Sequence, residues 1–330
     1  MILITGGAGY IGSHVNKLLY ESGRDTVVLD NLVYGHAGAV KWGKLVKTDL
    51  GDIDKLKSLF DEYKFDTVFH FAAYAYVGES VKDPARYYRN NVVNTINLLD
   101  AMREHSTKRM IFSSSCAIYG VPRSVPIKED AQQNPINPYG RTKLMMEQLL
   151  EDYHAAYGLD YCCLRYFNAA GADPGGEIGE CHMPETHLIP LVLAAAADSR
   201  NSLDVFGTDY PTRDGSCIRD YIHVADLAMA HLQAMEYLQS GGESRCINLG
   251  NGAGFSVLEV IDAAKRVTGR EIRVNLCDRR AGDPPELVGS AESAKKLLDW
   301  KPQFSRIDTM IEHPWIWHQN PNKYGQGEEA

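Results

Sequence analysis

A tyrosine, a lysine and a serine have the residue types needed for acid–base chemistry. Tyr139 and Lys143 are four residues apart, so on a helix both project from one face. A free phenol titrates near pH ~10, and a nearby cation lowers this pKa by stabilising the phenolate. We therefore expect Lys143 to help Tyr139 act as a general base, with Ser115 hydrogen-bonding to the same substrate hydroxyl. An ordinary amphipathic helix is the alternative interpretation.

The neighbouring sequence predicts the elements that position these groups. Asn137 is a good helix cap and Pro138 suits the first helical position, so a helix carrying Tyr139 and Lys143 begins here. A buried strand over 109–112 runs into three serines, the last of which is Ser115. The serine thus lies at the carboxyl end of a strand.

A glycine-rich turn near the N-terminus predicts a dinucleotide site. A buried strand at residues 2–5 is followed by glycines at positions 6, 7, 9 and 12, and then by a helix. A side chain at Gly6 or Gly9 would hold a pyrophosphate away from the helix N–H groups. A side chain at Gly12 would push the helix off the strand. An ordinary strand-to-helix turn is the alternative.

A second strand ends in an acid that selects the cofactor. The strand at 26–30 ends at Asp30, at the separation where a carboxylate reaches the adenosine ribose 2′-OH. Because Asp30 would repel a 2′-phosphate, we expect NAD rather than NADP. Asp49, near the end of a predicted strand over 44–50, is placed for an adenine amino group, although a helix cap is nearly as good an interpretation.

Short apolar strands alternate with helices through the first half of the chain. The segment 67–71 predicts a strand that leads into small residues beside a ligand, and 84–104 predicts one long helix. This alternation predicts an α/β fold, a Rossmann-type doubly wound parallel sheet with a smaller C-terminal α/β domain. The carboxyl ends of its strands should carry the chemistry.

The second half changes character after a strand over 161–165. A loop rich in glycine and proline over 169–184 is a candidate lid, and a helix is expected over 225–239. Arg219 and Arg280 are candidates for a second diphosphate, with solvated surface arginines as the equal alternative.

Metal ligands are conceivable in the same loop, at Cys181, His182, Glu185 and His187. Their spacing matches no site that we can name, so we expect no metal. We also assign no chemistry to His14, His70 or His223.

Charge and composition exclude several classes of protein. The formal net charge is −9, which argues against nucleic-acid or anionic-membrane partners. The first strand starts at Ile2, and no apolar run approaches membrane-spanning length, so we expect a cytoplasmic protein. The seven cysteines form no Cys-x-x-Cys pair, which suits free thiols in a reducing compartment.

Several motifs together resemble the extended short-chain dehydrogenase/reductases, and within them the bacterial UDP-glucose 4-epimerases. The resemblance runs from Thr5 to about Trp317. Its most specific pieces are Phe69-His-Phe-Ala-Ala73, Val77-Gly-Glu-Ser80, Phe112-Ser-Ser-Ser115, Tyr139-x-x-x-Lys143, Arg165-Tyr-Phe-Asn168, Arg219-Asp-Tyr-Ile-His-Val224 and Arg279-Arg-Ala-Gly-Asp283.

The resemblance implies a function and a set of site residues. The implied reaction interconverts UDP-galactose and UDP-glucose with tightly bound NAD, in a homodimer. The implied catalytic residues are Ser115, Tyr139 and Lys143. The cofactor-binding set is Gly6, Gly9, Tyr10, Ile11, Gly12, Asp30, Asn31, Asp49, Leu50, Phe71, Ala72, Asn90 and Lys143. The substrate-binding set is Ser115, Tyr139, Asn168, Leu188, Phe206, Arg219, Arg280, Asp283 and Leu287. Residues 1–168 would mainly bind NAD, with a return to that domain around 205–250, and residues 169–330 would mainly bind the nucleotide sugar.

Two departures from the family pattern leave alternatives open. Some members carry a lysine where this chain has Ala75, so one cofactor phosphate contact is in question. A pocket-closing tyrosine of some relatives is Leu287 here, which leaves acceptance of N-acetylated UDP-sugars open. Epimerases of UDP-glucuronate or UDP-pentoses also remain, as does a non-catalytic NAD-binding regulator. A 4,6-dehydratase is disfavoured because Cys116 and Ala117 stand where such enzymes carry acids.

Overall fold

A computed structural model describes residues 1–198, 202–280, 282–320 and 323–325. Its main element is a seven-stranded sheet in which every neighbouring pair is parallel, in the order β11-β6-β5-β4-β1-β2-β3. The expected doubly wound parallel sheet is thus confirmed. These strands are β1 (Ile2–Thr5), β2 (Thr26–Asp30), β3 (Lys44–Lys47), β4 (Thr67–His70), β5 (Arg109–Ser115), β6 (Asp160–Tyr166) and β11 (Arg245–Leu249).

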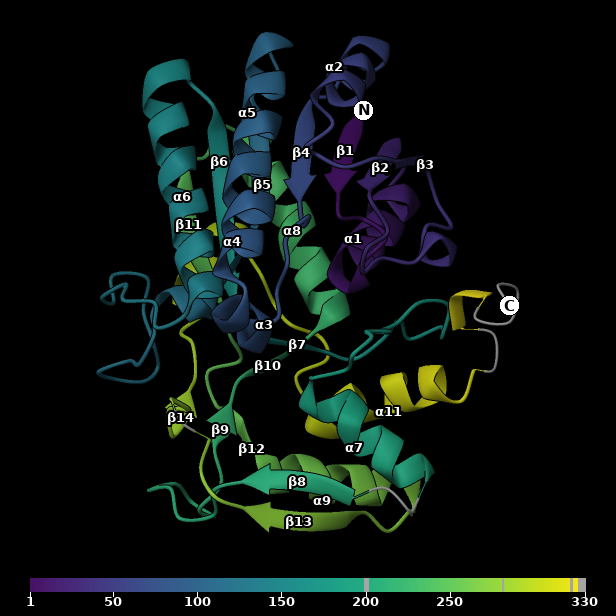
Figure 1. The fold of residues 1–330 in the computed structure, drawn as a ribbon, viewed down its shortest axis with the longest axis vertical. Helices are drawn as coiled ribbons and strands as arrows, with labels where there is room; N and C mark the ends of the chain where they lie inside the picture. The colour runs from purple at the N-terminus through teal and green to yellow at the C-terminus, as the bar shows by residue number, and fades with distance from the viewer. Residues whose placement is uncertain (199–201, 281, 321–322, 326–330) are drawn as a thin grey trace.

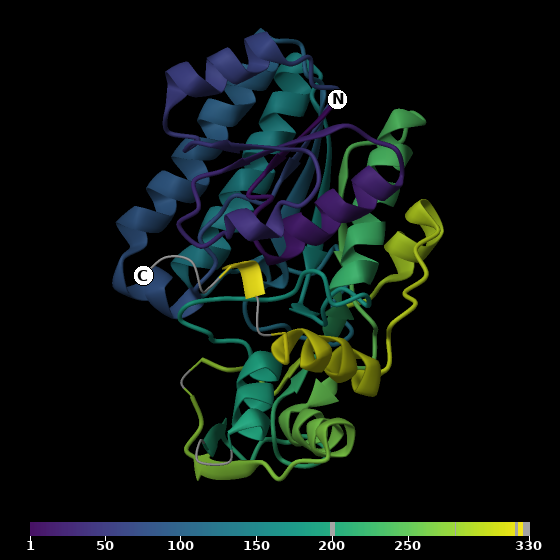
Figure 2. The ribbon, with the colours of Figure 1, turned by 90° about the vertical axis from the view of Figure 1, so that its right-hand side faces the viewer.

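Helices cover both faces of the large sheet. In Figure 2 the sheet lies between blue α5 and teal α6 on one side and green α8 on the other. The helices are α1 (Tyr10–Glu21), α2 (Ile53–Glu62), α3 (Val77–Lys82), α4 (Pro84–Tyr87), α5 (Asn94–Glu104), α6 (Pro138–Tyr157), α7 (Leu188–Ala197), α8 (Val224–Gln239), α9 (Val257–Thr268), α10 (Glu292–Leu298) and α11 (Ile307–His318). Short turns are the 3₁₀ segments η1 (Ala37–Ala39), η3 (Cys116–Ile118) and η4 (Lys323–Gly325) and the π-helical turn η2 (Tyr88–Val93).

The core follows from the period-2 alternation of the strands. In β1, Ile2 and Ile4 pack with residues of α1 and α8, whereas Leu3 packs on the opposite face with residues of α2, α5 and α6. Because both faces are buried, the strands are nearly continuous apolar runs, as parallel sheets require.

A smaller group of elements lies beyond the carboxyl ends of the large sheet (Figure 1). Strands β8 and β13 form a parallel pair, β12-β9-β14 form a small mixed sheet, and β10 pairs with β7. Residues of α7, α9 and α11 form a separate core with this group. These strands are β7 (Asn168–Ala170), β8 (Ser202–Phe206), β9 (Ile218–Arg219), β10 (Tyr221–His223), β12 (Phe255–Ser256), β13 (Arg273–Cys277) and β14 (Glu286–Leu287).

Two boundaries differ from the expectations. The predicted single helix over 84–104 is α4, then the π-helical turn η2, then α5. The expected strand over 44–50 stops at Lys47, because Asp49 turns back to accept the backbone N–H of Gly51. Within the described residues, no helix has both the length and the apolar character needed to cross a membrane.

Candidate active site

The glycine turn between β1 and α1 is shaped by close backbone approaches. Gly6 has a φ of +73°, and a Cβ there would lie 2.5 Å from the backbone nitrogen of Ala72. A Cβ at Gly12 would lie 2.5 Å from the Gly6 carbonyl oxygen, so a side chain there would push α1 off the strand, as the sequence suggested. For Gly6, however, the close neighbour is the chain after β4. Gly9 is the N-cap of α1 and offers no side chain to its first N–H groups.

Asp30, at the end of β2, forms hydrogen bonds with the glycine turn and with the loop that follows β2. Its carboxylate accepts the backbone N–H of Ala8 at 3.0 Å and that of Leu32 at 2.8 Å. Burial raises the pKa of the Asp30 carboxyl, although these two N–H groups oppose the shift. Gly35 also contributes, since a Cβ there would lie 2.9 Å from an Asp30 oxygen. Sequence reasoning did not single out Gly35, because it lies in a loop without a recognisable pattern.

Further cofactor candidates gather along the same edge of the sheet. Asn31 donates to the Asp49 carboxylate at 2.6 Å, and the neighbouring Leu50 is buried. Phe71 follows β4 and packs against the ring of His231 with centroids 4.9 Å apart. Asn90 lies in the π-helical turn η2, an irregularity that is frequent at functional sites.

At the position of the missing lysine, Ala75 is exposed between two tyrosines. The rings of Tyr74 and Tyr76 each make an edge contact with Tyr34, at 5.3 and 5.2 Å between centroids. Arg86 lies over the Tyr74 ring at 4.4 Å and pairs with Glu79. Ala75 is therefore flanked by an aromatic cluster, and the nearby cation is Arg86 instead of the lysine that the family resemblance led us to consider.

Helix α6 and strand β5 bring the three acid–base candidates together. The Asn137 side chain accepts the Gly140 N–H and caps α6 at its expected start. The Ser115 hydroxyl neighbours the Tyr139 phenol and favours its ionised form. The Lys143 Nζ lies 5.9 Å from the centre of the Tyr139 ring and donates to the Ser113 carbonyl oxygen at 2.6 Å.

The pKa values of this group differ from the expectation. Burial raises the pKa of Tyr139 to about 12, and the neighbouring Ser115 hydroxyl only opposes the shift. Burial lowers the pKa of Lys143 to about 7. In the protein by itself, burial thus outweighs the lowering that we expected Lys143 to cause. A phenolate at neutral pH needs additional positive charge next to the phenol.

A buried ion pair that sequence reasoning missed lies one turn further along α6. Glu147 and Arg165 are joined by two hydrogen bonds, at 2.9 and 2.7 Å, and each side chain is 4% exposed. Ser114 donates to the same carboxylate at 2.5 Å. Glu147 is the largest electrostatic influence that favours the charged form of Lys143. Its position four residues after Lys143 was the available signal.

The predicted substrate residues gather in and around the small sheets. Arg219 on β9 donates to the carbonyl oxygen of Pro284 at 2.9 Å and lies 3.8 Å from the Asp283 carboxylate. Leu287 on β14 is the strand partner of Arg219. The Arg280 guanidinium lies 4.4 Å from the centre of the Phe206 ring. Asn168 on β7 donates to the Asp220 carbonyl oxygen at 2.9 Å, whereas Leu188 begins α7.

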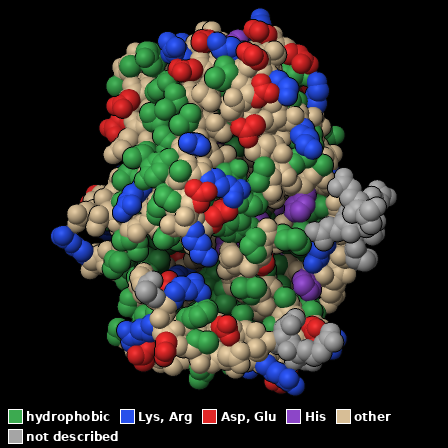
Figure 3. Space-filling model, viewed as in Figure 1, with side chains coloured by type: hydrophobic (Ala, Val, Ile, Leu, Met, Phe, Trp, Pro, Cys, Tyr) green, Lys and Arg blue, Asp and Glu red, His purple; other side chains and the backbone are tan. Residues whose placement is uncertain are grey.

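One small apolar cluster connects these residues to the acid–base group. Leu287 and Cys116 pack against buried Tyr119 and Phe167. Since Cys116 directly follows Ser115, β14 and the carboxyl end of β5 both lie beside this apolar cluster. Figure 3 shows the surface hollowed between the two parts of the molecule, with Lys and Arg side chains near its edge.

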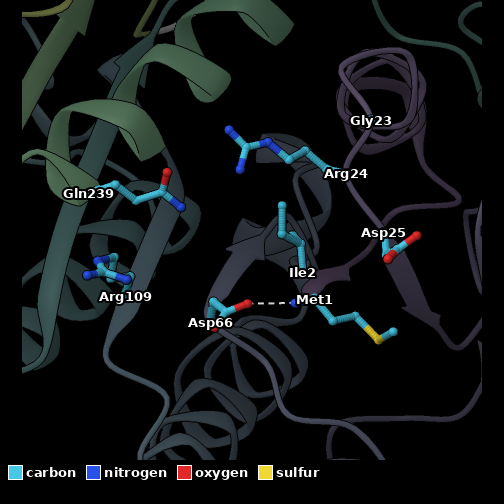
Figure 4. Close-up of a pocket in the computed structure, with 8 residues that line it drawn as sticks. All are labelled: Met1, Ile2, Gly23, Arg24, Asp25, Asp66, Arg109 and Gln239. Atoms are coloured by element: carbon cyan, nitrogen blue, oxygen red, sulfur yellow. Dashed lines mark hydrogen bonds and ion pairs between the residues drawn. The ribbon is translucent and has the colours of Figure 1, made fainter.

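A separate hollow lies at the opposite, amino ends of the strands (Figure 4). It measures about 280 Å³ and is lined by Arg24, Arg109 and Gln239 together with the N-terminal residues. The Met1 ammonium pairs with Asp66 at 2.6 Å. None of the predicted site residues lines this hollow.

Comparisons with known proteins agree with the fold described above. The model of the NAD dependent epimerase/dehydratase family matches residues 2–250. The UDP-glucose 4-epimerase of Halalkalibacterium halodurans is 52% identical over 324 residues, covering 98% of this chain and 97% of the relative. The crystal structure of the Brucella ovis UDP-glucose 4-epimerase in complex with NAD has a TM-score of 0.93 at 53% identity, covering 96% of this chain and 98% of that one. A Bifidobacterium longum UDP-glucose 4-epimerase in complex with NAD⁺ and UDP has a TM-score of 0.91 at 37% identity, covering 97% of this chain and 99% of that one.

Proposed function

Because the chain belongs to the NAD dependent epimerase/dehydratase family, we propose that it interconverts UDP-galactose and UDP-glucose by inverting the sugar C4. The observation that carries this proposal is the convergence of Tyr139, Lys143 and Ser115 at the carboxyl end of β5, where the Lys143 ammonium donates to the strand at 2.6 Å and lies 5.9 Å from the centre of the Tyr139 ring. This arrangement would present a proton acceptor and a hydroxyl to the same substrate oxygen, on the edge of the sheet that also holds the glycine turn. The names of the relatives support the same reaction.

The glycine turn fits the pyrophosphate of NAD. Among the residues that the structure describes, the only close neighbour of a Cβ at Gly9 would be the Gly6 carbonyl oxygen at 3.3 Å, so the outer side of this turn lies open beside the first N–H groups of α1. Asp30 is fixed by Ala8 and Leu32 at the place where a ribose hydroxyl would bind. The remaining cofactor contacts are proposed at Gly6, Tyr10, Ile11, Gly12, Asn31, Asp49, Leu50, Phe71, Ala72, Asn90 and Lys143.

The C4–H bond of a hexose is not acidic, so C4 cannot be inverted by simple proton transfer and must first be oxidised to a ketone. The chemistry that NAD supplies when bound is reversible hydride transfer, which makes C4 a planar ketone. Rotation of the 4-keto sugar would then turn the other face of C4 toward the cofactor, so that return of the hydride gives the inverted configuration. Tyr139 accepts the proton of the 4-hydroxyl and later returns it, while Ser115 hydrogen-bonds to that oxygen. Lys143 orients the phenol and adds positive charge. The positive nicotinamide ring would supply the additional charge that the pKa of Tyr139 requires.

We propose that residues 169–330 mainly bind the nucleotide sugar and that residues 1–168 mainly bind NAD. Arg219 and Arg280 would bind the diphosphate, because guanidinium groups match phosphate oxygens. Leu287 would line the sugar pocket beside the carboxyl end of β5. The other proposed contacts are Asn168, Leu188, Phe206 and Asp283.

We also propose that the protein acts in the cytoplasm and that it forms a homodimer. Large apolar side chains are exposed on α3, η2 and α6, at Val81, Val93, Met145 and Tyr157. These helices neighbour one another on the same side of the large sheet (Figure 1). Light scattering of the purified protein should give twice the chain mass, and a monomer would contradict the dimer.

The decisive experiment is conversion of UDP-galactose to UDP-glucose by purified protein with no NAD added. Conversion would support both the reaction and a retained cofactor. The same assay with UDP-N-acetylgalactosamine examines the pocket beside Leu287. If the protein retains NAD but converts neither sugar, then UDP-glucuronate and UDP-pentoses are the next substrates. Bound NAD without turnover of any of them would favour a regulator.

A further inference from the structure

The segment between β7 and α7 brings together four metal-ligating side chains. Each offers one ligand atom, and these atoms all lie within 4.8 Å of one another. Two are imidazoles and two are carboxylates, and we refer to them as the His/Glu cluster: Glu180, His182, Glu185 and His187. The sequence alone suggested Cys181 in place of Glu180 and gave no reason to expect a metal. The tertiary structure changes the ligand set and supplies the convergence that the spacing lacked.

The buried carboxylate of Glu180 is the centre of this cluster. Its side chain is 5% exposed, its Oε1 lies 2.9 Å from Nδ1 of His182, and the same oxygen contacts Nδ1 of His187. The Glu185 carboxylate lies 3.9 Å from Nδ1 of His182. A buried carboxylate facing two ring nitrogens needs positive charge between these groups, which either protons or a cation can supply.

Neighbouring groups hold the backbone of this segment in place. Trp317 donates its indole N–H to the Glu180 carbonyl oxygen at 3.0 Å. The Tyr324 hydroxyl donates to the Gly179 carbonyl oxygen at 2.7 Å and accepts the Gly179 N–H at 2.8 Å. The Glu185 carboxylate accepts the backbone N–H of His187 at 2.8 Å. Trp317 and Tyr324 therefore hold the backbone that carries Glu180, and Glu185 fixes the backbone at His187 from within the cluster.

We propose that the His/Glu cluster binds one divalent transition-metal ion of the zinc class. Two imidazole nitrogens with two carboxylate oxygens suit zinc, whereas magnesium and calcium prefer sites made wholly of oxygen. Ligand atoms of a tetrahedral zinc site lie about 3.4 Å apart, which is within the spread of this cluster. Four protein ligands fill a tetrahedron, so the ion has a structural role. This inference is independent of the proposed epimerase reaction.

The position of the cluster indicates what the ion would stabilise. The His182 ring makes edge contacts with Tyr10 at 6.3 Å and with Tyr76 at 6.1 Å between centroids. His187 directly precedes Leu188, the first residue of α7. An ion held here connects the start of α7 to residues beside the glycine turn. Its loss should loosen this segment without removing any acid–base group.

Zinc binding to the untagged holoenzyme tests the proposal, after removal of metals with a chelator. Calorimetric titration should show one Zn²⁺ per chain, with no comparable binding of Mg²⁺, and bound Zn²⁺ should raise the Tm. Co²⁺ in the same site should give the visible absorption of a tetrahedral ion without a thiolate charge-transfer band. Failure to bind Zn²⁺ in a 1:1 ratio, or a thiolate band, would overturn the proposal.

Variants locate the ion. His182→Gln combined with Glu185→Gln should weaken zinc binding by about 100-fold or more. The matched control is His105→Gln, which removes an imidazole whose Nε2 lies 3.0 Å from exposed Asp61, and which should leave zinc binding unchanged. Unchanged binding by the double variant would contradict the assignment. If circular dichroism shows that the double variant is unfolded, the Co²⁺ spectrum of the wild type decides.

Discussion

The ammonium of Lys143 donates a 2.6 Å hydrogen bond to the carbonyl oxygen of Ser113. This bond joins the first turns of α6 to the last residues of β5, although the two residues are 30 positions apart. Because Ser115 lies two residues further along the strand and Tyr139 lies four residues before Lys143, the bond joins the two segments that carry the proposed serine and tyrosine. The position of the proposed base therefore depends on a helix-to-strand contact as well as on its spacing from Lys143.

Replacing Tyr139 by phenylalanine tests the proposed base. Tyr139→Phe removes the only atom that accepts the 4-hydroxyl proton and keeps the ring, so kcat should fall by about 10²–10⁴-fold while NAD retention and Tm stay close to wild type. UDP-galactose turnover and the absorbance of bound NAD provide the measurements. Tyr20→Phe, at an exposed position on α1, is the matched control. Activity within a few-fold of wild type would remove Tyr139 from the mechanism.

The buried pair of Glu147 and Arg165 should contribute strongly to stability. Glu147→Gln leaves the guanidinium buried without its counter-charge, which should lower the free energy of unfolding by about 3–5 kcal/mol. The double change to methionine should cost less than the sum of the single changes Glu147→Met and Arg165→Met, and these three variants with the wild type form a double-mutant cycle. Urea unfolding of the four proteins measures this coupling. The exposed pair Lys44 and Glu62 is the control, and similar small effects at both pairs would refute the prediction.

Buried histidines should make the protein sensitive to mild acid. Burial lowers the pKa of His70 to about 3 and that of His231 to about 4, below the ~6.5 of an unfolded chain. At pH values between the folded and the unfolded pKa of each histidine, its imidazole is protonated in the unfolded state and neutral in the folded state. Stability is therefore complete above pH ~6.5 and falls on acidification, by up to about 1.4 kcal/mol per pH unit for each histidine.

His231→Leu isolates one of these contributions. His231 packs between Phe71 and Tyr166, and its Nε2 has no hydrogen-bond partner among the described residues. Urea unfolding at pH 7 and pH 5 should show a shallower loss of stability for the variant than for the wild type. An identical loss in both proteins would show that His231 does not titrate as its burial implies.

Leu287 should control the size of the sugar that the site accepts. Leu287→Tyr places a larger side chain in the wall shared with Cys116 and Phe167. It should lower kcat/KM for UDP-N-acetylgalactosamine by about tenfold or more relative to UDP-galactose, because the N-acetyl group needs the space that the ring would fill. Competition between the two sugars measures this ratio. An equal loss for both would place Leu287 outside the sugar pocket.

The local sequence pattern was enough to predict the elements that carry the proposed cofactor-binding and acid–base residues. The glycine turn, the strand ends at Asp30 and Ser115, and the helix of Tyr139 and Lys143 all follow from interactions within a few residues: caps, periodicity and the freedom of glycine. The π-helical turn η2 escaped this reasoning, because its apolar pattern is that of an ordinary helix.

Contacts between distant residues were decided only by the tertiary structure. The pairing of Glu147 with Arg165, the stacking of Arg280 on Phe206 and the burial that raises the pKa of Tyr139 depend on strand order and on the paths of long loops. The same is true of Glu180, which loop folding brings to His182 and His187. Spacing along the chain determines which side chains share a helix face or a strand end, but packing between elements determines their neighbours and their electrostatic environment.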